Sequence, residues 1–115
     1  MRGTDPLFLY GTLLDRGVLT REAGDARLHR RAIPAEAPGF RRVVLRGTPY
    51  PTLTPGSGIV AGLLIRPTPA TLTRLRAYEG PFYRLVPLRV RTARGAVRAC
   101  AWMAPSWRAA PRPWP

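Results

Sequence analysis

The first regular pattern in the chain is a short apolar run, Leu7, Phe8 and Leu9, which ends abruptly in Tyr-Gly-Thr. Three consecutive apolar residues before a turn predict a short strand that is covered on both faces. Gly11 then allows either a positive φ or a close approach of another group to the backbone. The pattern predicts a buried strand over residues 7–9 that leads into a binding loop, although an ordinary tight turn has the same pattern.

Two further strands are predicted over residues 27–36 and 40–46, on either side of an Ala-Pro-Gly turn. The second of them carries β-branched residues at its centre, which favours a strand. Residues 47–58 follow and contain so many Pro and Gly residues that they predict an irregular loop. Loops of this length often carry function.

Residues 59–65 are the most apolar segment and predict a central strand, in which Gly62 marks a bulge or a close backbone approach. Residues 83–92 and 96–103 predict two more strands, joined by a hairpin turn at Arg-Gly.

Two helices are predicted. Residues 15–22 can form a short helix with Asp15 near its N-cap. The clearer helix has Thr68 as N-cap and Pro69 as its first residue, and its apolar residues recur at helical spacing until Gly80 and the following Pro end it. Strands therefore outnumber helices about six to two, without regular βαβ alternation. This predicts an α+β domain with a curved mixed sheet or a small β-barrel.

Glu79 lies in the last turn of the second predicted helix. A carboxylate there faces the negative end of the helix dipole, at a cost of about 0.3 to 1 kcal/mol. Residues that break a local rule are expected at functional sites. The alternative is a solvated carboxylate at a helix end.

Composition and charge narrow the class of protein. The chain has 115 residues, enough for one domain with a single core, and its 19 basic residues are all Arg against six acidic residues, for a net charge of +13. The excess of positive charge favours contact with a polyanion, an acidic substrate or simply solubility. Nucleic acid is possible as a partner but is not favoured, because the arginines are spread along the chain. Self-repulsion slightly favours a monomer.

A single cysteine, Cys100, excludes an intramolecular disulfide and fits a reducing cytoplasm. Its apolar surroundings predict a small buried side chain in a strand rather than a reactive thiol. His29, the one histidine, is expected on a strand surface, and without partners neither residue predicts a metal site. The sequence predicts neither a signal peptide nor a membrane span, and it has no Rossmann fingerprint or P-loop.

The last twelve residues, 104–115, form a basic, Pro-rich segment with two tryptophans, Trp107 and Trp114. They are expected to run extended, as a tail beyond a domain at residues 1–103. The tryptophans could stack on nucleotides, bind a partner or pack on the domain surface.

The chain resembles the gamma-glutamylcyclotransferase-like superfamily over about residues 6–103. Members carry a Tyr-Gly-Ser/Thr-Leu/Asn loop directly after the first strand, and other landmarks follow in family order. The matching segments here are Tyr10-Gly11-Thr12-Leu13, Tyr50-Pro51, Val60-Ala-Gly62, Glu79-Gly80 and Tyr83-Arg84. One departure is Arg76, which stands where many relatives have Asp and leaves open whether activity differs.

The resemblance implies the gamma-glutamylcyclotransferase-like fold and a small enzyme that releases 5-oxoproline from a γ-glutamyl amine or peptide. Glu79 would be the catalytic acid/base, and Tyr10, Gly11, Thr12 and Leu13 would bind the γ-glutamyl group, largely through backbone amides. No cofactor or metal is implied.

Two further residues, Tyr83 and Arg84, are additional candidates for substrate binding. Arg84 could hold a substrate carboxylate, or it could be one more surface arginine. The alternative function for the whole chain is a non-catalytic basic module that binds nucleic acid or another acidic partner.

Overall fold

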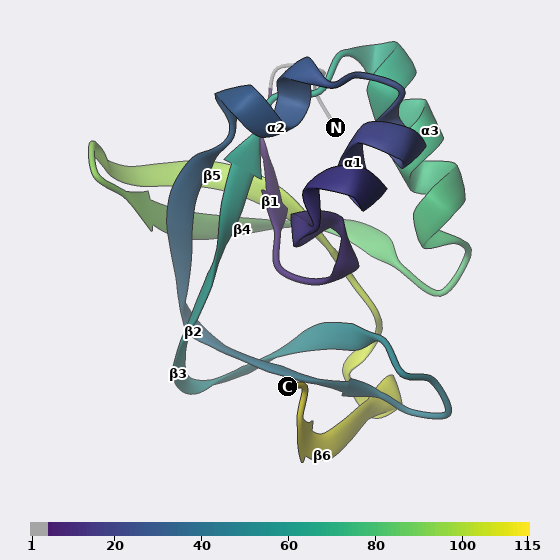
Figure 1. Ribbon diagram of the computed structural model, residues 1–115. Coiled ribbons are helices and arrows are strands. Elements are labelled where there is room, and N and C mark those ends of the chain that lie inside the picture. Colours follow the sequence, from purple (N-terminus) through teal and green to yellow (C-terminus); the bar gives the residue numbers. More distant parts are fainter. Residues whose placement is uncertain (1–4) are drawn as a thin grey trace.

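The computed structural model describes residues 5–115 and consists of a small β-barrel with helices packed along one side (Figure 1). The strands are β1 (Leu7–Leu9), β2 (Ile33–Leu45), β3 (Pro51–Ile65), β4 (Arg84–Thr92), β5 (Gly95–Met103) and β6 (Ala109–Pro113). The helices are α1 (Arg16–Ala23), α2 (Arg27–Arg31) and α3 (Pro69–Glu79), with short 3₁₀ turns η1 (Thr12–Leu14) and η2 (Ser106–Arg108).

The barrel closes because β2 pairs with β3 as well as with β4. The strand order is β3-β1-β5-β4-β2, with β6 added to β2, and the pairing of β2 with β3 completes the ring. The contact of β1 with β5 is parallel and the others are antiparallel. This arrangement confirms the predicted α+β class with a small mixed barrel, although the described residues form three α-helices instead of about two.

The short strand β1 is buried on both faces, as its sequence predicts. Successive side chains of a strand point to opposite faces. Phe8 and Tyr10 therefore pack inside the barrel, whereas Leu7 and Leu9 pack against the helices. The outer cluster joins β1 to Leu19 of α1, to α3 and to Trp102 of β5. Because β1 contributes side chains to both clusters, the loop that follows β1 starts from a firmly packed strand.

The predicted strand over residues 27–36 is wrong in its first half. Residues Arg27–Arg31 form α2, and a single strand then runs from Ile33 to Leu45 without the expected turn at residues 37–39. The register against β3 shifts between Pro38 and Phe40, which is where the Pro-Gly pair is accommodated as a bulge. Continuous pairing with β3 on both sides of the bulge overrides the local turn signal.

The predicted loop over residues 47–58 is also wrong. The turn is confined to residues 46–50, and β3 begins at Pro51 and pairs with β2 from its first residue. Figure 1 shows the far half of this hairpin projecting from the barrel, with β6 beside it. Among residues 5–115, no strand pairs with the other side of residues 51–55, and proline is tolerated on such a free edge because it needs no donor there.

Both predicted helices are confirmed with their caps. The Asp15 carboxylate accepts a hydrogen bond from the Val18 amide at 3.0 Å, and the Thr68 hydroxyl accepts from the Thr71 amide at 3.2 Å. Gly80 ends α3 with a φ of 82°. The predicted strands on either side of residues 94–95 are confirmed as β4 and β5. None of the helices formed by residues 5–115 has the length and apolar character needed to span a membrane.

The C-terminal segment lies against the β2–β3 hairpin. Strand β6 pairs with β2, and the Trp114 indole N–H donates to the Pro49 carbonyl at 2.9 Å. One of the two tryptophans thus packs on the domain, while Trp107 is 70% exposed. The division of the chain at residue 103 stays a prediction.

Two single residues can now be placed. Cys100 is buried in β5, as predicted, and burial raises the pKa of its thiol. His29 lies on α2, so its predicted position on a strand is wrong. The local apolar spacing of this segment is weak, and Leu28 alone anchors the helix to the core.

Gly62 marks a close backbone approach, which is one of the two alternatives that the sequence predicted for this position. A Cβ atom at Gly62 would lie 2.1 Å from the carbonyl oxygen of Leu9 and 2.9 Å from the Phe8 ring. We expect Gly62→Ala to destabilise the protein by at least about 1 to 3 kcal/mol, the range for overpacking, because backbone must move. Denaturant unfolding measures the change. The exposed neighbour provides the control, Ala61→Ser, and equal stability of both variants would contradict the expectation.

Candidate functional site

A cavity of about 160 Å³ opens between the end of β1, the start of β3, the end of α3 and the first residues after it. The residues that line it are Phe8, Leu9, Tyr10, Gly11, Thr12, Leu13, Tyr50, Pro51, Tyr78, Glu79, Tyr83 and Trp102. This set brings together Glu79, the whole Tyr-Gly-Thr-Leu loop and Tyr83, which are far apart in the sequence. It contains no arginine, although the chain carries a net charge of +13.

Glu79 is the only acidic residue among those that line the cavity. It is the last residue of α3, and the turn at Gly80 directs the chain away from it. Burial raises the pKa of the Glu79 carboxyl from its ordinary value of 4.5 to about 7. Among residues 5–115 it makes no hydrogen bond or ion pair, and no arginine lowers its pKa. A carboxyl with such a pKa can both accept and return a proton near neutral pH.

The loop after β1 presents its backbone to the cavity. The Tyr10 side chain turns into the barrel, where its hydroxyl donates to the Trp102 carbonyl. Burial, followed by the neighbouring Tyr83 and Glu79, raises the pKa of Tyr10, so the phenol stays neutral. The amides of Gly11, Thr12 and Leu13 donate to no group within the described chain. They are therefore available to an acceptor oxygen.

The position of Gly11 has a steric requirement. A Cβ atom there would lie 2.7 Å from Cγ of Pro51, across the cavity wall. The proline ring is stiff and belongs to β3, so it cannot rotate away from an added methyl group. Glycine allows the loop to lie directly against the start of β3.

Substituting Gly11 by alanine should force the loop and Pro51 apart. We expect a loss of about 1 to 3 kcal/mol of stability, because the added methyl group overpacks this contact. Thermal unfolding measures it. Gly17 in α1 provides the matched control, because Gly17→Ala adds the same atom to an exposed helical site and helix propensity favours alanine. If Gly11→Ala unfolds at the same temperature as Gly17→Ala, the close approach of Gly11 to Pro51 does not constrain the residue at position 11.

Hydrogen bonds between distant segments hold the cavity wall. The Tyr83 hydroxyl donates to the Pro51 carbonyl at 2.8 Å, and the hydroxyls of Thr12 and Tyr78 lie 2.9 Å apart. Burial, with Glu79 nearby, raises the pKa of Tyr83. These contacts fix both sides of the cavity relative to α3.

Arg84, one of the residues suggested for substrate binding, does not line the cavity and is exposed at the start of β4. Arg76 is exposed on α3. Sequence reasoning did not select Tyr78, Pro51 or Trp102 as site residues. Pro51 lies in the Tyr50-Pro51 segment that the sequence singled out and Tyr78 adjoins another such segment, whereas nothing local in β5 marks Trp102.

Metal binding finds no support in the described part of the chain. No group of three or more His, Cys, Asp or Glu side chains there is arranged to hold a metal ion. The cavity itself supplies one carboxylate, several hydroxyls and free amides. The carboxylate can exchange a proton with a ligand, and the amides can donate hydrogen bonds to a carbonyl oxygen.

Solved structures of other proteins have the same fold as this chain. Two Arabidopsis thaliana proteins with solution structures match with TM-scores of 0.74 and 0.73 at 26% and 27% identity, over 87% and 93% of this chain. This chain spans 61% and 72% of their respective lengths. A structure named gamma-glutamyl cyclotransferase matches with a TM-score of 0.71 at 16% identity, over 88% of this chain and 66% of its own, and shares the fold.

Comparison at the level of sequence families covers nearly the whole chain. No significant match to a curated protein was found. The family described as gamma-glutamyl cyclotransferase, AIG2-like, matches residues 7–114, which include the cavity and the C-terminal strand β6. The chain therefore belongs to the gamma-glutamyl cyclotransferase, AIG2-like family.

Proposed function

We propose that the protein is a cyclotransferase that releases 5-oxoproline from a γ-glutamyl amine or peptide, with Glu79 as general acid and base. In this reaction the α-amine of the γ-glutamyl group attacks its own γ-carbonyl carbon, and the bond from that carbon to the leaving nitrogen breaks. The products are 5-oxoproline and a free amine. No water, metal or cofactor takes part, and the nucleophile belongs to the substrate.

The observation that supports this proposal is the isolated, largely buried carboxyl of Glu79 opposite the free amides of the Gly11–Leu13 loop. Burial raises its pKa to about 7. Within the described part of the chain, no arginine lines the cavity, where it would repel a substrate ammonium group. A base and hydrogen-bond donors for a developing oxyanion thus line the same cavity.

The proton path follows from these positions. The substrate loses one ammonium proton to solvent and attacks as the free α-amine, and the Glu79 carboxylate takes a second proton from this nitrogen as its bond to the γ-carbonyl carbon forms. The negative charge that forms on the γ-carbonyl oxygen is bound by amides among Gly11, Thr12 and Leu13. Protonated Glu79 then gives its proton to the leaving nitrogen, and the carboxylate is restored. Because the attack closes a five-membered ring, holding a folded substrate conformer supplies much of the rate.

Release of 5-oxoproline from a panel of γ-glutamyl amines, amino acids and peptides tests the proposal. The native chain should convert at least one of these compounds, in amounts equal to the amine released. Conversion should be about 100- to 10,000-fold slower in Glu79→Gln. If the folded protein converts no compound of the panel, the proposal is wrong.

The same preparation can test the alternative of a basic binding module. Steeply salt-dependent retention on heparin that Glu79→Gln leaves unchanged, in a protein without turnover, would favour binding of an acidic partner. Trp107, at 70% exposure, and the arginines would then form the contact.

A further inference from the structure

Arg42 reaches the loop of the candidate site from the opposite hairpin. It belongs to β2, and its Nη1 donates a hydrogen bond of 2.8 Å to the carbonyl oxygen of Tyr10. The two residues are 32 positions apart in the chain. Arg42 does not line the cavity itself, so any effect on a ligand must pass through the loop.

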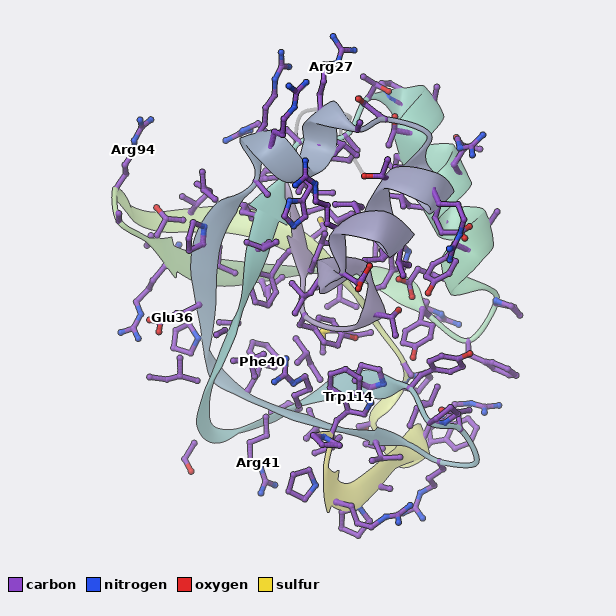
Figure 2. All side chains as sticks on the ribbon, in the orientation of Figure 1. Arg27, Glu36, Phe40, Arg41, Arg94 and Trp114 are labelled. Atoms are coloured by element: carbon purple, nitrogen blue, oxygen red, sulfur yellow. The ribbon has the colours of Figure 1, made fainter. Side chains whose placement is uncertain are left out.

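The C-terminal end of the chain holds Arg42 in place. Its guanidinium lies over the Trp114 ring, 5.2 Å from the ring centroid. Trp114 is fixed by two hydrogen bonds, from its amide to the Arg42 carbonyl at 3.1 Å and from its indole to the Pro49 carbonyl at 2.9 Å. Figure 2 shows Trp114 on the barrel side of the hairpin and Arg41 on the other side.

The charge of Arg42 has no carboxylate partner among residues 5–115. Its Nε atom is buried without a hydrogen-bond partner. Arg42 as a whole is half-buried, and removing part of a cation from water is costly unless the charge is paired, so a purely structural link would be expected to use a neutral donor or an ion pair. The hydrogen bond that the guanidinium does make, to the Tyr10 carbonyl, is a charge-assisted one.

The Tyr10 carbonyl and the Gly11 N–H belong to the same peptide group, whose atoms share electrons by resonance. A cationic donor on the oxygen draws electron density from the nitrogen and makes the N–H a stronger donor, as in cooperative hydrogen-bond chains. Gly11 lines the cavity and its amide donates to no group in the described residues.

We infer that Arg42 is a positioning residue that polarises the Tyr10–Gly11 peptide, so that the Gly11 amide binds the oxygen on which negative charge develops. Trp114 keeps the guanidinium in line with the Tyr10 carbonyl. The inference rests on the proposed cyclotransferase reaction for its effect on rate. Its effect on the peptide group does not depend on that reaction.

The Gly11 amide resonance in NMR spectra of the full chain tests the polarisation directly. We expect the Gly11 amide proton to move upfield in Arg42→Gln, which keeps a donor but loses the charge. Arg42→Lys, which keeps the charge, should restore part of the shift. Arg41→Gln, which removes a charge on the other side of the hairpin, should leave the resonance in place.

Kinetics of the same variants test the consequence for the reaction. We expect kcat to fall about tenfold in Arg42→Gln with KM little changed, a fraction of the loss caused by removing an oxyanion donor. Arg42→Lys should recover part of kcat. An unchanged Gly11 resonance in folded Arg42→Gln overturns the inference. A rise in KM alone, with all the loop resonances displaced, also overturns it, because this result marks a merely structural role of Arg42.

A native protein that converts no γ-glutamyl compound would disprove the proposed function without deciding this inference. The Gly11 resonance and the affinity for 5-oxoproline, titrated by NMR, then decide it. Binding that weakens in Arg42→Gln together with the upfield shift supports the polarised amide. A shift without any change in affinity or kcat overturns its role in the site.

Discussion

Replacing Glu79 by glutamine is expected to lower kcat for 5-oxoproline release by about 100- to 10,000-fold, the contribution of a general acid or base in the transition state. Glutamine keeps the size and polarity of the side chain but cannot take a proton from the attacking amine nitrogen. The cavity offers no substitute, since Glu79 is the one acidic residue that lines it in the described chain. The Tyr10 and Tyr83 hydroxyls donate to backbone carbonyls, and their pKa values are raised by burial.

Steady-state kinetics on a converted substrate provide the measurement, with Glu36→Gln as control. Glu36 is exposed and forms a surface ion pair with Arg91 at 3.3 Å, so its substitution removes the same charge far from the cavity. We expect Glu36→Gln to keep native kcat. Retention of turnover by Glu79→Gln would mean that another group moves the proton.

Under the proposed function, the pH dependence of turnover by the native protein follows from the same carboxyl. Glu79 must be ionised to act first as a base, and its pKa is raised to about 7. The acidic limb of kcat/KM, which reports the free enzyme, should therefore bend near pH 7 rather than near 4.5, the ordinary value.

The same substitution is expected to stabilise the protein at alkaline pH, which is the second large effect. The folded state binds the Glu79 proton more tightly than the unfolded state, since the pKa is raised from 4.5 to about 7. Stability from this group is fully present below about pH 4.5 and is lost as pH rises to about 7. A shift of this size corresponds to at most about 3 kcal/mol. Glutamine carries no charge, so Glu79→Gln avoids the loss.

Denaturant unfolding at two pH values checks this expectation. At pH 8 Glu79→Gln should be the more stable protein, by up to about 3 kcal/mol, and near pH 4.5 the two should be nearly equal. Taking the difference between the two chains cancels the other groups that titrate. A variant less stable than native at pH 8 would show that the ionised carboxylate has a stabilising partner. If the functional site lowers the stability of the fold, then Glu79→Gln should gain stability and lose activity together.

The features that the sequence predicted correctly are local ones. The caps of α1 and α3 depend on Asp15 and Thr68 and on amides three residues away. Strand β1 follows from three adjacent apolar residues, and a hairpin turn forms at residues 93–94, one position before the predicted Arg-Gly pair. Local physical chemistry decides each of these, so neighbouring residues suffice to predict them.

The candidate site was reached from the sequence in part. The loop at residues 10–13 and Glu79 were selected by a motif and by a carboxylate at the unfavourable end of a helix. Their approach to one cavity, together with Tyr83, depends on how α3 packs against β1. Whether these residues carry the chemistry stays a prediction.

Only the tertiary structure decided the long β2–β3 hairpin, the identity of residues 27–31 as a helix and the place of the C-terminal segment. Strand pairing over long sequence separations outweighs Pro and Gly signals when the prolines lie on a free edge and the glycine takes a bulge. The sequence by itself determined the fold class, the ends of its main helices and the two segments of the site. The burial that raises the pKa of Glu79, and the guanidinium of Arg42 on the Tyr10 carbonyl, exist only because distant strands and helices pack together.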